Sequence, residues 1–140
     1  MTRALSIDYG DVRVGIAISD PMRIIGKPLL TLDNNEVLIE EIMNLINIHN
    51  VTDLVVGYPI GMKGQITEQT KKVDNFISKL ESVLTIPITP IDERLSSVTA
   101  TESLIKQGIK TGFNKAKIDE TSAAIILQEF LDTKNNEKNF

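Results

Sequence analysis

The sequence predicts a single mixed α/β domain in which an antiparallel meander is followed by parallel strands and helices. The N-terminal part holds short apolar or alternating runs separated by turn residues, which is typical of a meander. Later apolar runs alternate with stretches of helical periodicity, and this alternation indicates parallel strands joined by helices. The length of 140 residues suits one domain with a substantial core. We expect the domain to cover residues 1–133, and residues 134–140 to form a polar, flexible tail.

The meander is expected to contain three strands. Residues 4–7 are apolar, and residues 13–19 alternate with apolar side chains. The join at residues 8–12 is predicted to be a hairpin loop, in which Asp8 would be a turn residue. Residues 21–32 are expected to form an edge strand with its approach loop. Gly15, inside the second strand, indicates a close backbone approach or a bulge.

The next elements follow from apolar spacing and from residues that can cap a helix. A first helix is expected over residues 38–49, with Asn34 or Asn35 as its cap, and Thr67 caps a second helix. Residues 53–57 form a continuous apolar run, which favours a central strand covered on both faces. Residues 86–91 are expected to form the last strand.

Two more helices complete the predicted order of elements. Ser96 or Ser97 is the expected cap of a third helix, which ends near Gly108. Asn114 opens a last helix that reaches about Leu131. The chain shows no internal repeat and no linker, which again favours one domain.

The composition excludes several classes of protein. No apolar run is long enough to span a membrane, and the N-terminus lacks a basic region followed by a long apolar stretch. The absence of cysteine excludes disulfides and thiolate metal sites. We therefore expect a cytoplasmic protein without a membrane partner. The net charge of −4 means that binding to nucleic acid would need local positive charge or metal ions.

Acidic residues are expected to meet at one edge of the sheet. Asp8 ends the first strand and Asp92-Glu93 ends the last, so parallel strands would bring them to the same edge. Asp119 lies on the sheet-facing stripe of the last helix, where an unpaired carboxylate would be costly. Carboxylates held close together repel one another, so the cluster needs a cation to neutralise it. Because the ligands are all oxygen atoms, the cation is expected to be Mg²⁺ or Mn²⁺. Such ions suit phosphoryl transfer.

The alternative interpretation gives each acid an ordinary structural role. Asp8 would be a turn residue, Glu93 would pair with Arg94, and Asp119 would be an acid in the first turn of a helix. Spacing alone also does not choose between Asp92 and Glu93.

Four segments of the chain resemble the YqgF family, also called RuvX. They are SIDYGDVRVGIAISD, VVGYPIGMKG, IDERLSS and IDETSAAIILQEFLD, and they span nearly the whole chain in the family's order. The resemblance implies a ribonuclease H-like fold, with a five-stranded mixed sheet made of a three-strand meander and two parallel strands, flanked by helices. It also implies a Holliday-junction-resolvase-like nuclease that uses one or two Mg²⁺ or Mn²⁺ ions.

The resemblance further assigns roles to particular residues. Its acidic triad would be Asp8, Glu93 and Asp119, which act as catalytic residues and metal ligands, and Arg13 and Arg94 would contact substrate phosphates. The implied substrate is the 5′ end of the precursor of the small-subunit (16S) ribosomal RNA, which makes the ribosomal particle a further expected partner.

The chain departs from the family pattern at two positions. Val12 stands where the family often has lysine, and Gly61 lies where an asparagine is common. Both departures remove polar groups near the expected site, so substrate choice is less well defined than the triad.

Other features have a functional and a structural interpretation. Lys115 and Lys117 belong to a lysine-rich stretch beside Asp119 that would bind substrate, although a solvated face explains such lysines equally well. The glycine-containing loop at residues 58–64 could hold a phosphate or be a plain surface loop. His49 is expected to be structural.

Rival functions come from other classes of protein. The first motif also resembles the phosphate motif of actin-like and sugar-kinase ATPases, but these hold nucleotide between two lobes and this chain supplies one. A non-catalytic ribosome-assembly module is a second rival. A nuclease acting on a DNA four-way junction is a variant of the main hypothesis, and it would favour a homodimer over a monomer because two strands are cut.

Overall fold

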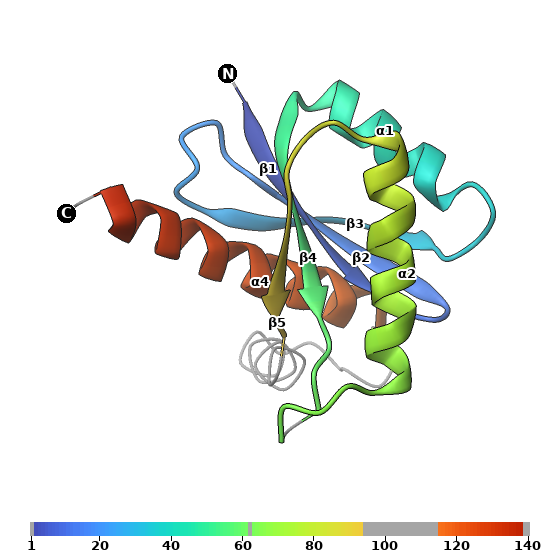
Figure 1. Cartoon of the computed structure of the whole chain (residues 1–140). Helices are drawn as coiled ribbons and strands as arrows, with labels where there is room; N and C mark the ends of the chain where they lie inside the picture. The colour runs from blue at the N-terminus through green and yellow to red at the C-terminus, as the bar shows by residue number, and fades with distance from the viewer. Residues whose placement is uncertain (1, 62, 94–114, 139–140) are drawn as a thin grey trace.

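The computed structural model describes residues 2–61, 63–93 and 115–138 (Figure 1). The elements are, in chain order, β1 (Arg3–Tyr9), β2 (Arg13–Ser19), β3 (Gly26–Asp33), α1 (Leu38–Ile48), β4 (Val51–Tyr58), α2 (Glu68–Val83), β5 (Ile88–Asp92) and α4 (Lys115–Lys138). The third helix expected after Ser96 or Ser97, its end near Gly108, and Asn114 all lie outside the described residues.

The strands form one five-stranded sheet in the order β3-β2-β1-β4-β5. Strands β1, β2 and β3 pair antiparallel, whereas β4 pairs parallel with both β1 and β5. This arrangement confirms the expected meander with two added parallel strands. Because β1, β4 and β5 run in the same direction, they end at one edge of the sheet, which we call the carboxyl rim (Figure 1).

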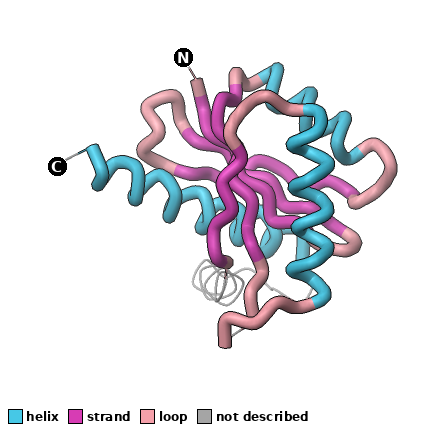
Figure 2. The backbone as a smooth tube through the Cα atoms, viewed as in Figure 1, coloured by secondary structure: helices cyan, strands magenta, loops and turns pink. Residues whose placement is uncertain are grey.

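Helices cover both faces of the sheet (Figure 2). Helices α1 and α2 pack on one face, over a core that includes Leu5, Ile7, Val14, Ile16, Leu54, Val56, Phe76 and Leu80. Helix α4 packs alone among the described helices on the other face, against Ala4, Ala17 and Val55. Most of the large apolar side chains of the strands therefore point to α1 and α2, whereas the buried strand residues facing α4 are alanine and valine, with the partly buried Ile91 beside them.

The small residues on the second face let α4 approach the sheet closely. The Ser6 hydroxyl donates a hydrogen bond of 2.5 Å to the backbone carbonyl of Ala123. A Cβ atom added to Gly15 would lie 3.0 Å from the Cβ of Asp119 and closer still to the backbone carbonyl of Asp119. The expected close backbone approach at Gly15 is confirmed, and it fixes the start of α4 over β2.

The end of one strand and the start of one helix differ from the sequence expectation. Strand β1 continues to Tyr9, so Asp8 lies within the strand and pairs with Gly15 instead of entering the loop. The prediction that Asn34 or Asn35 caps α1 is wrong, because the N-cap is Val37. Asn35 instead accepts a 3.1 Å hydrogen bond from the Val37 N–H, which forms a turn ahead of the helix.

One helix end is set by a local contact and another is held by a contact distant in sequence. Thr67 caps α2 as expected, since its hydroxyl accepts from the Thr70 N–H in a capping box. Helix α4 does not end near Leu131 but continues to Lys138. The side chain of Asn135 donates to the backbone carbonyl of Arg23 at 3.1 Å, which holds this part of α4 against the β2–β3 connection. In the described part of the chain, none of the helices has the length and apolar character that crossing a bilayer requires.

Candidate active site

Asp8 lies near the end of β1 on the face covered by α4. Its neighbours in the sheet have no side chain. Gly15 is its partner in β2, and Gly57 follows Val56, the β4 partner of Ile7. Two adjacent strands therefore leave space around the Asp8 carboxyl group that other residues fill.

Glu93 fills the space over β4. It follows β5 directly, and its backbone N–H donates a 3.3 Å hydrogen bond to the carbonyl of Tyr58. A Cβ atom added to Gly57 would lie 3.2 Å from Glu93 Cδ and closer still to Oε2, so the carboxyl group lies over Gly57. From there it forms a side-chain hydrogen bond with Asp8.

The contact between two acids has a clear electrostatic consequence. Burial, together with the charge of Asp8 and the shared hydrogen bond, raises the pKa of Glu93 from 4.5 to about 9. Burial raises the pKa of Asp8 to about 6, while the hydrogen bond from Glu93 lowers it and the charge of Asp119 raises it. At neutral pH and without a cation, Glu93 holds a proton that it donates to the Asp8 carboxylate.

Asp119 approaches the pair from α4. Its backbone lies against Gly15, the partner of Asp8, and its charge acts on the pKa of Asp8. Its Oδ2 atom accepts a hydrogen bond of 2.9 Å from Arg13 Nε in a partly exposed ion pair. Arg13 therefore contacts a member of the expected triad, and its proposed contact with substrate phosphate remains a prediction.

The structure gathers the expected metal ligands only in part. Asp8 and Glu93 touch, and Asp119 lies beside them, paired with Arg13. Within the residues described, no three histidine, cysteine, aspartate or glutamate side chains are grouped closely enough to hold a metal ion. The oxygen donors of Asp8 and Glu93 suit a hard divalent cation, which would replace the proton between them. Joint coordination with Asp119 stays a prediction.

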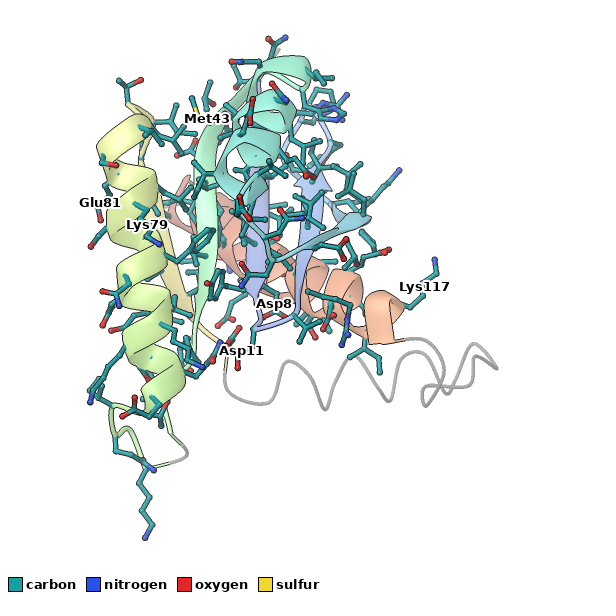
Figure 3. All side chains as sticks on the ribbon, turned by 90° about the vertical axis from the view of Figure 1, so that its right-hand side faces the viewer. Asp8, Asp11, Met43, Lys79, Glu81 and Lys117 are labelled. Carbon is teal, nitrogen blue, oxygen red and sulfur yellow. The ribbon has the colours of Figure 1, made fainter. Side chains whose placement is uncertain are left out.

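The remaining predicted site residues are placed as follows. Arg94 lies outside the described residues, and so does the side chain of Lys115. Lys117 is exposed at the start of α4 and points away from Asp8 (Figure 3). Asp92 is exposed, whereas Glu93 is partly buried and contacts Asp8. His49 is the C-cap of α1, before β4 begins, and so lies at the end of the sheet opposite the carboxyl rim.

In the described part of the loop between β4 and α2, three backbone N–H groups are used within the loop itself. The N–H of Gly61 donates to the carbonyl of Gln65 at 2.9 Å, and that of Gly64 donates to Gly61 at 2.7 Å. The N–H of Lys63 donates to the Gln65 side chain at 3.0 Å. Because these donors are occupied, the geometry favours a tight surface loop over a phosphate cradle.

Sequence patterns missed the contacts by which α2 fixes the carboxyl rim. The Tyr9 ring stacks on Phe76 with centroids 4.4 Å apart, and Gln69 donates to the Tyr9 carbonyl at 3.2 Å. The Tyr58 hydroxyl donates to Asp74, and this hydrogen bond raises the pKa of the tyrosine. Gly57 was also missed, although a glycine ending a buried apolar run is a signal of close packing.

Comparison with known sequences identifies a family. The model described as "RuvX: Holliday junction resolvase" matches residues 2–133. A protein of Roseiflexus sp. (strain RS-1) is 41% identical over 133 residues, which are 94% of each chain. A protein of Bacteroides fragilis (strain YCH46) is 39% identical over 137 residues, covering 96% of this chain and 99% of its own. Both relatives bear the name "Putative pre-16S rRNA nuclease".

Solved structures with little sequence identity share the fold. RuvC of T. thermophilus, solved in complex with a Holliday junction substrate, gives a TM-score of 0.64 at 9% identity, over 97% of both chains. The fowlpox virus resolvase, solved with its Holliday junction DNA substrate, gives 0.60 at 10% identity, over 94% of this chain and 98% of its own. This likeness confirms the ribonuclease H-like fold.

Proposed function

The chain belongs to the RuvX family, and we propose that it is a metal-dependent nuclease that hydrolyses phosphodiester bonds in the precursor of 16S ribosomal RNA. The names of its relatives support this substrate. A role in ribosome biogenesis implies a cytoplasmic location and makes the ribosomal particle the expected partner.

The observation that carries the proposal is the carboxyl pair of Asp8 and Glu93. Burial raises the pKa of both acids, and the charge of Asp8 raises that of Glu93 further, so without a cation the pair keeps a proton at neutral pH. Such groups cluster at functional sites. The pair also lies at the carboxyl rim, where ligands of open α/β sheets bind.

We assign one or two Mg²⁺ or Mn²⁺ ions to Asp8, Glu93 and Asp119. When bound, such an ion lowers the pKa of water and stabilises the leaving oxygen. For Glu93 to act as a ligand, its carboxyl group must lose the proton that it donates to Asp8. Arg13 orients Asp119 through its Nε atom and places positive charge beside the acids, where a substrate phosphate would enter.

Two groups of residues complete the proposed substrate site. Arg94 is assigned to substrate phosphate by its motif, and Lys115 and Lys117 would attract the polyanion from the start of α4. Because the whole chain has a net charge of −4, binding must rely on such local cations and on the metal ions.

A four-way DNA junction is the second candidate substrate. The description of the matching family as Holliday junction resolvases favours it. A junction contains two strands to cut, so this function would favour a homodimer with two sites over a monomer.

The experiment that tests the proposal is a cleavage panel. Single-stranded RNA with the precursor sequence, single-stranded DNA and a four-way DNA junction are each incubated with Mn²⁺, with Mg²⁺ or with a chelator. We expect metal-dependent cleavage of the RNA. Cleavage of the junction alone would replace the proposed substrate by the second candidate. No cleavage of any substrate by wild-type protein, under conditions in which it binds metal, would overturn the nuclease proposal.

A further inference from the structure

We propose that Gly57 is a positioning residue whose missing side chain opens the path by which Glu93 crosses β4 and reaches Asp8. The inference rests on the proposed function, because it concerns the same carboxyl pair. Gly57 has no side chain of its own, and its part in the site is to leave room for the side chain of Glu93.

The need for such a path follows from the order of strands. Strand β4 lies between β1, which carries Asp8, and β5, which precedes Glu93. Neighbouring strands are about 4.8 Å apart, so β1 and β5 are separated by roughly 10 Å. Glu93 bridges this separation only by passing over the backbone of β4, and Gly57 is the residue over which it passes.

A side chain at this position would close the path. The Cβ atom of an alanine at position 57 would lie 2.7 Å from Ile126 Cδ1, 3.2 Å from Glu93 Cδ and closer still to Glu93 Oε2. Real Cβ atoms essentially never approach other atoms to under 3.0 Å, so a neighbour must move. The carboxyl group of Glu93 lies at the tip of a flexible side chain, so rotation of this side chain away from Asp8 is the smallest movement that makes room for the methyl group.

The same reasoning separates Gly57 from Gly15. A Cβ atom at Gly15 would meet the backbone of Asp119, so alanine there would displace α4 as a whole. At Gly57 both obstacles are ends of side chains, and the backbone of Gly57 is in a regular strand that alanine tolerates. Gly57→Ala is therefore expected to fold and to disturb the carboxyl pair selectively.

The primary test is a crystal structure of Gly57→Ala. We expect β4 and α4 to keep their positions while the Glu93 carboxyl group no longer contacts Asp8. Cleavage by this variant should fall by about 10²-fold, since a displacement of about 1 Å in a catalytic group has an effect of that size. A structure in which Glu93 still hydrogen-bonds to Asp8, or unchanged cleavage, would overturn the inference.

Two further variants separate positioning from general packing. Gly57→Ala/Ile126→Val removes the Cδ1 atom that the new methyl group meets, so it protects the fold and should leave cleavage low. If the double variant regains cleavage, the loss of cleavage in Gly57→Ala comes from altered packing of α4, and the proposal is contradicted. Gly26→Ala is a control for packing against α4. Its Cβ would also meet α4, 3.1 Å from Leu127 Cγ and 3.2 Å from the Ala124 carbonyl oxygen, but at the start of β3, beside Ser19 and away from Asp8. It should retain wild-type cleavage.

The inference and the proposed function fail in different ways. If wild-type protein cleaves nothing and Glu93 nevertheless leaves Asp8 in Gly57→Ala, the proposed function is wrong and the positioning role stands. If wild-type protein and Gly57→Ala cleave RNA equally well, the nuclease function stands and the positioning role is wrong.

Discussion

The carboxyl groups of Asp8 and Glu93 form a hydrogen bond with each other across strand β4. Asp8 lies in the first strand of the chain, and Glu93 directly follows the last. Such a contact requires a proton between the two groups. The site thus holds a proton where the proposed function requires a cation, and the two compete for the same oxygen atoms.

The metal-free protein is expected to lose stability as the pH rises. The pKa of Glu93 is about 9 in the folded chain and 4.5 for a free side chain, so the folded state binds more protons between these values. Its contribution to stability is complete below pH 4.5 and is lost as the pH rises towards 9, with a slope of at most about 1.4 kcal/mol per pH unit.

Urea unfolding of wild-type protein and Glu93→Gln at several pH values, with a chelator present, measures this effect. The free energy of unfolding should fall more steeply between pH 6 and pH 9 in the wild type than in Glu93→Gln, because glutamine does not titrate. Parallel profiles for the two proteins would mean that the pKa of Glu93 is not raised by folding.

Arg13 is expected to affect substrate more than stability. Its ion pair with Asp119 is partly exposed and should contribute at most about 1 kcal/mol to the free energy of unfolding. Arg13→Ala should weaken RNA binding and reduce the slope of log K against log salt by about one unit. Arg13→Lys, which keeps the charge, should retain the salt slope. If Arg13→Ala lowers only the melting temperature, the residue orients Asp119 and does not contact phosphate.

Much of the fold and part of the site follow from local sequence patterns. Apolar periodicity places the strands, and the parallel order brings Asp8 and Glu93 to one edge because both lie at strand ends. Small residues on the α4 face, such as Gly15, indicate the close approach that brings Asp119 near. These features depend on spacing within single elements, which a sequence displays directly.

Features that depend on contacts between distant elements were not predictable in this way. Strand β1 extends to Tyr9, whose ring stacks on Phe76 of α2, and this contact competes with the local preference for a loop. Helix α4 passes Leu131 and contacts the β2–β3 connection through Asn135. The role of Gly57 requires the register of three strands at once.

The capping box at the start of α2 is expected to stabilise the fold without taking part in the chemistry. Thr67→Ala removes the acceptor for the Thr70 N–H and should lower the free energy of unfolding by about 1 kcal/mol. Cleavage per folded molecule should remain at the wild-type level. Thr85→Ala, at an exposed threonine beyond the other end of α2, should leave stability nearly unchanged. Equal free energies of unfolding for the two variants, measured with urea, would mean that the Thr67 cap does not stabilise the fold.

Asp8→Asn tests whether the carboxyl pair binds the cation on which cleavage depends. The substitution keeps the shape of the strand end and removes one charge, so metal-free stability should hold or rise slightly. Ligand binding to the native state adds about 2.7 kcal/mol at a concentration 100 times Kd, so Mn²⁺ should raise the melting temperature of the wild type and raise that of Asp8→Asn less. Glu81→Gln changes an exposed carboxylate at the far end of the molecule and should behave like the wild type (Figure 3).

The most direct measurement combines melting curves with and without Mn²⁺ and a cleavage assay on single-stranded RNA, for wild type and Asp8→Asn. The account predicts that the variant folds, gains less stability from Mn²⁺ and cleaves slower by orders of magnitude. Equal gains in melting temperature for both proteins, or cleavage that persists in purified Asp8→Asn, would contradict the assignment of Asp8 to the metal site.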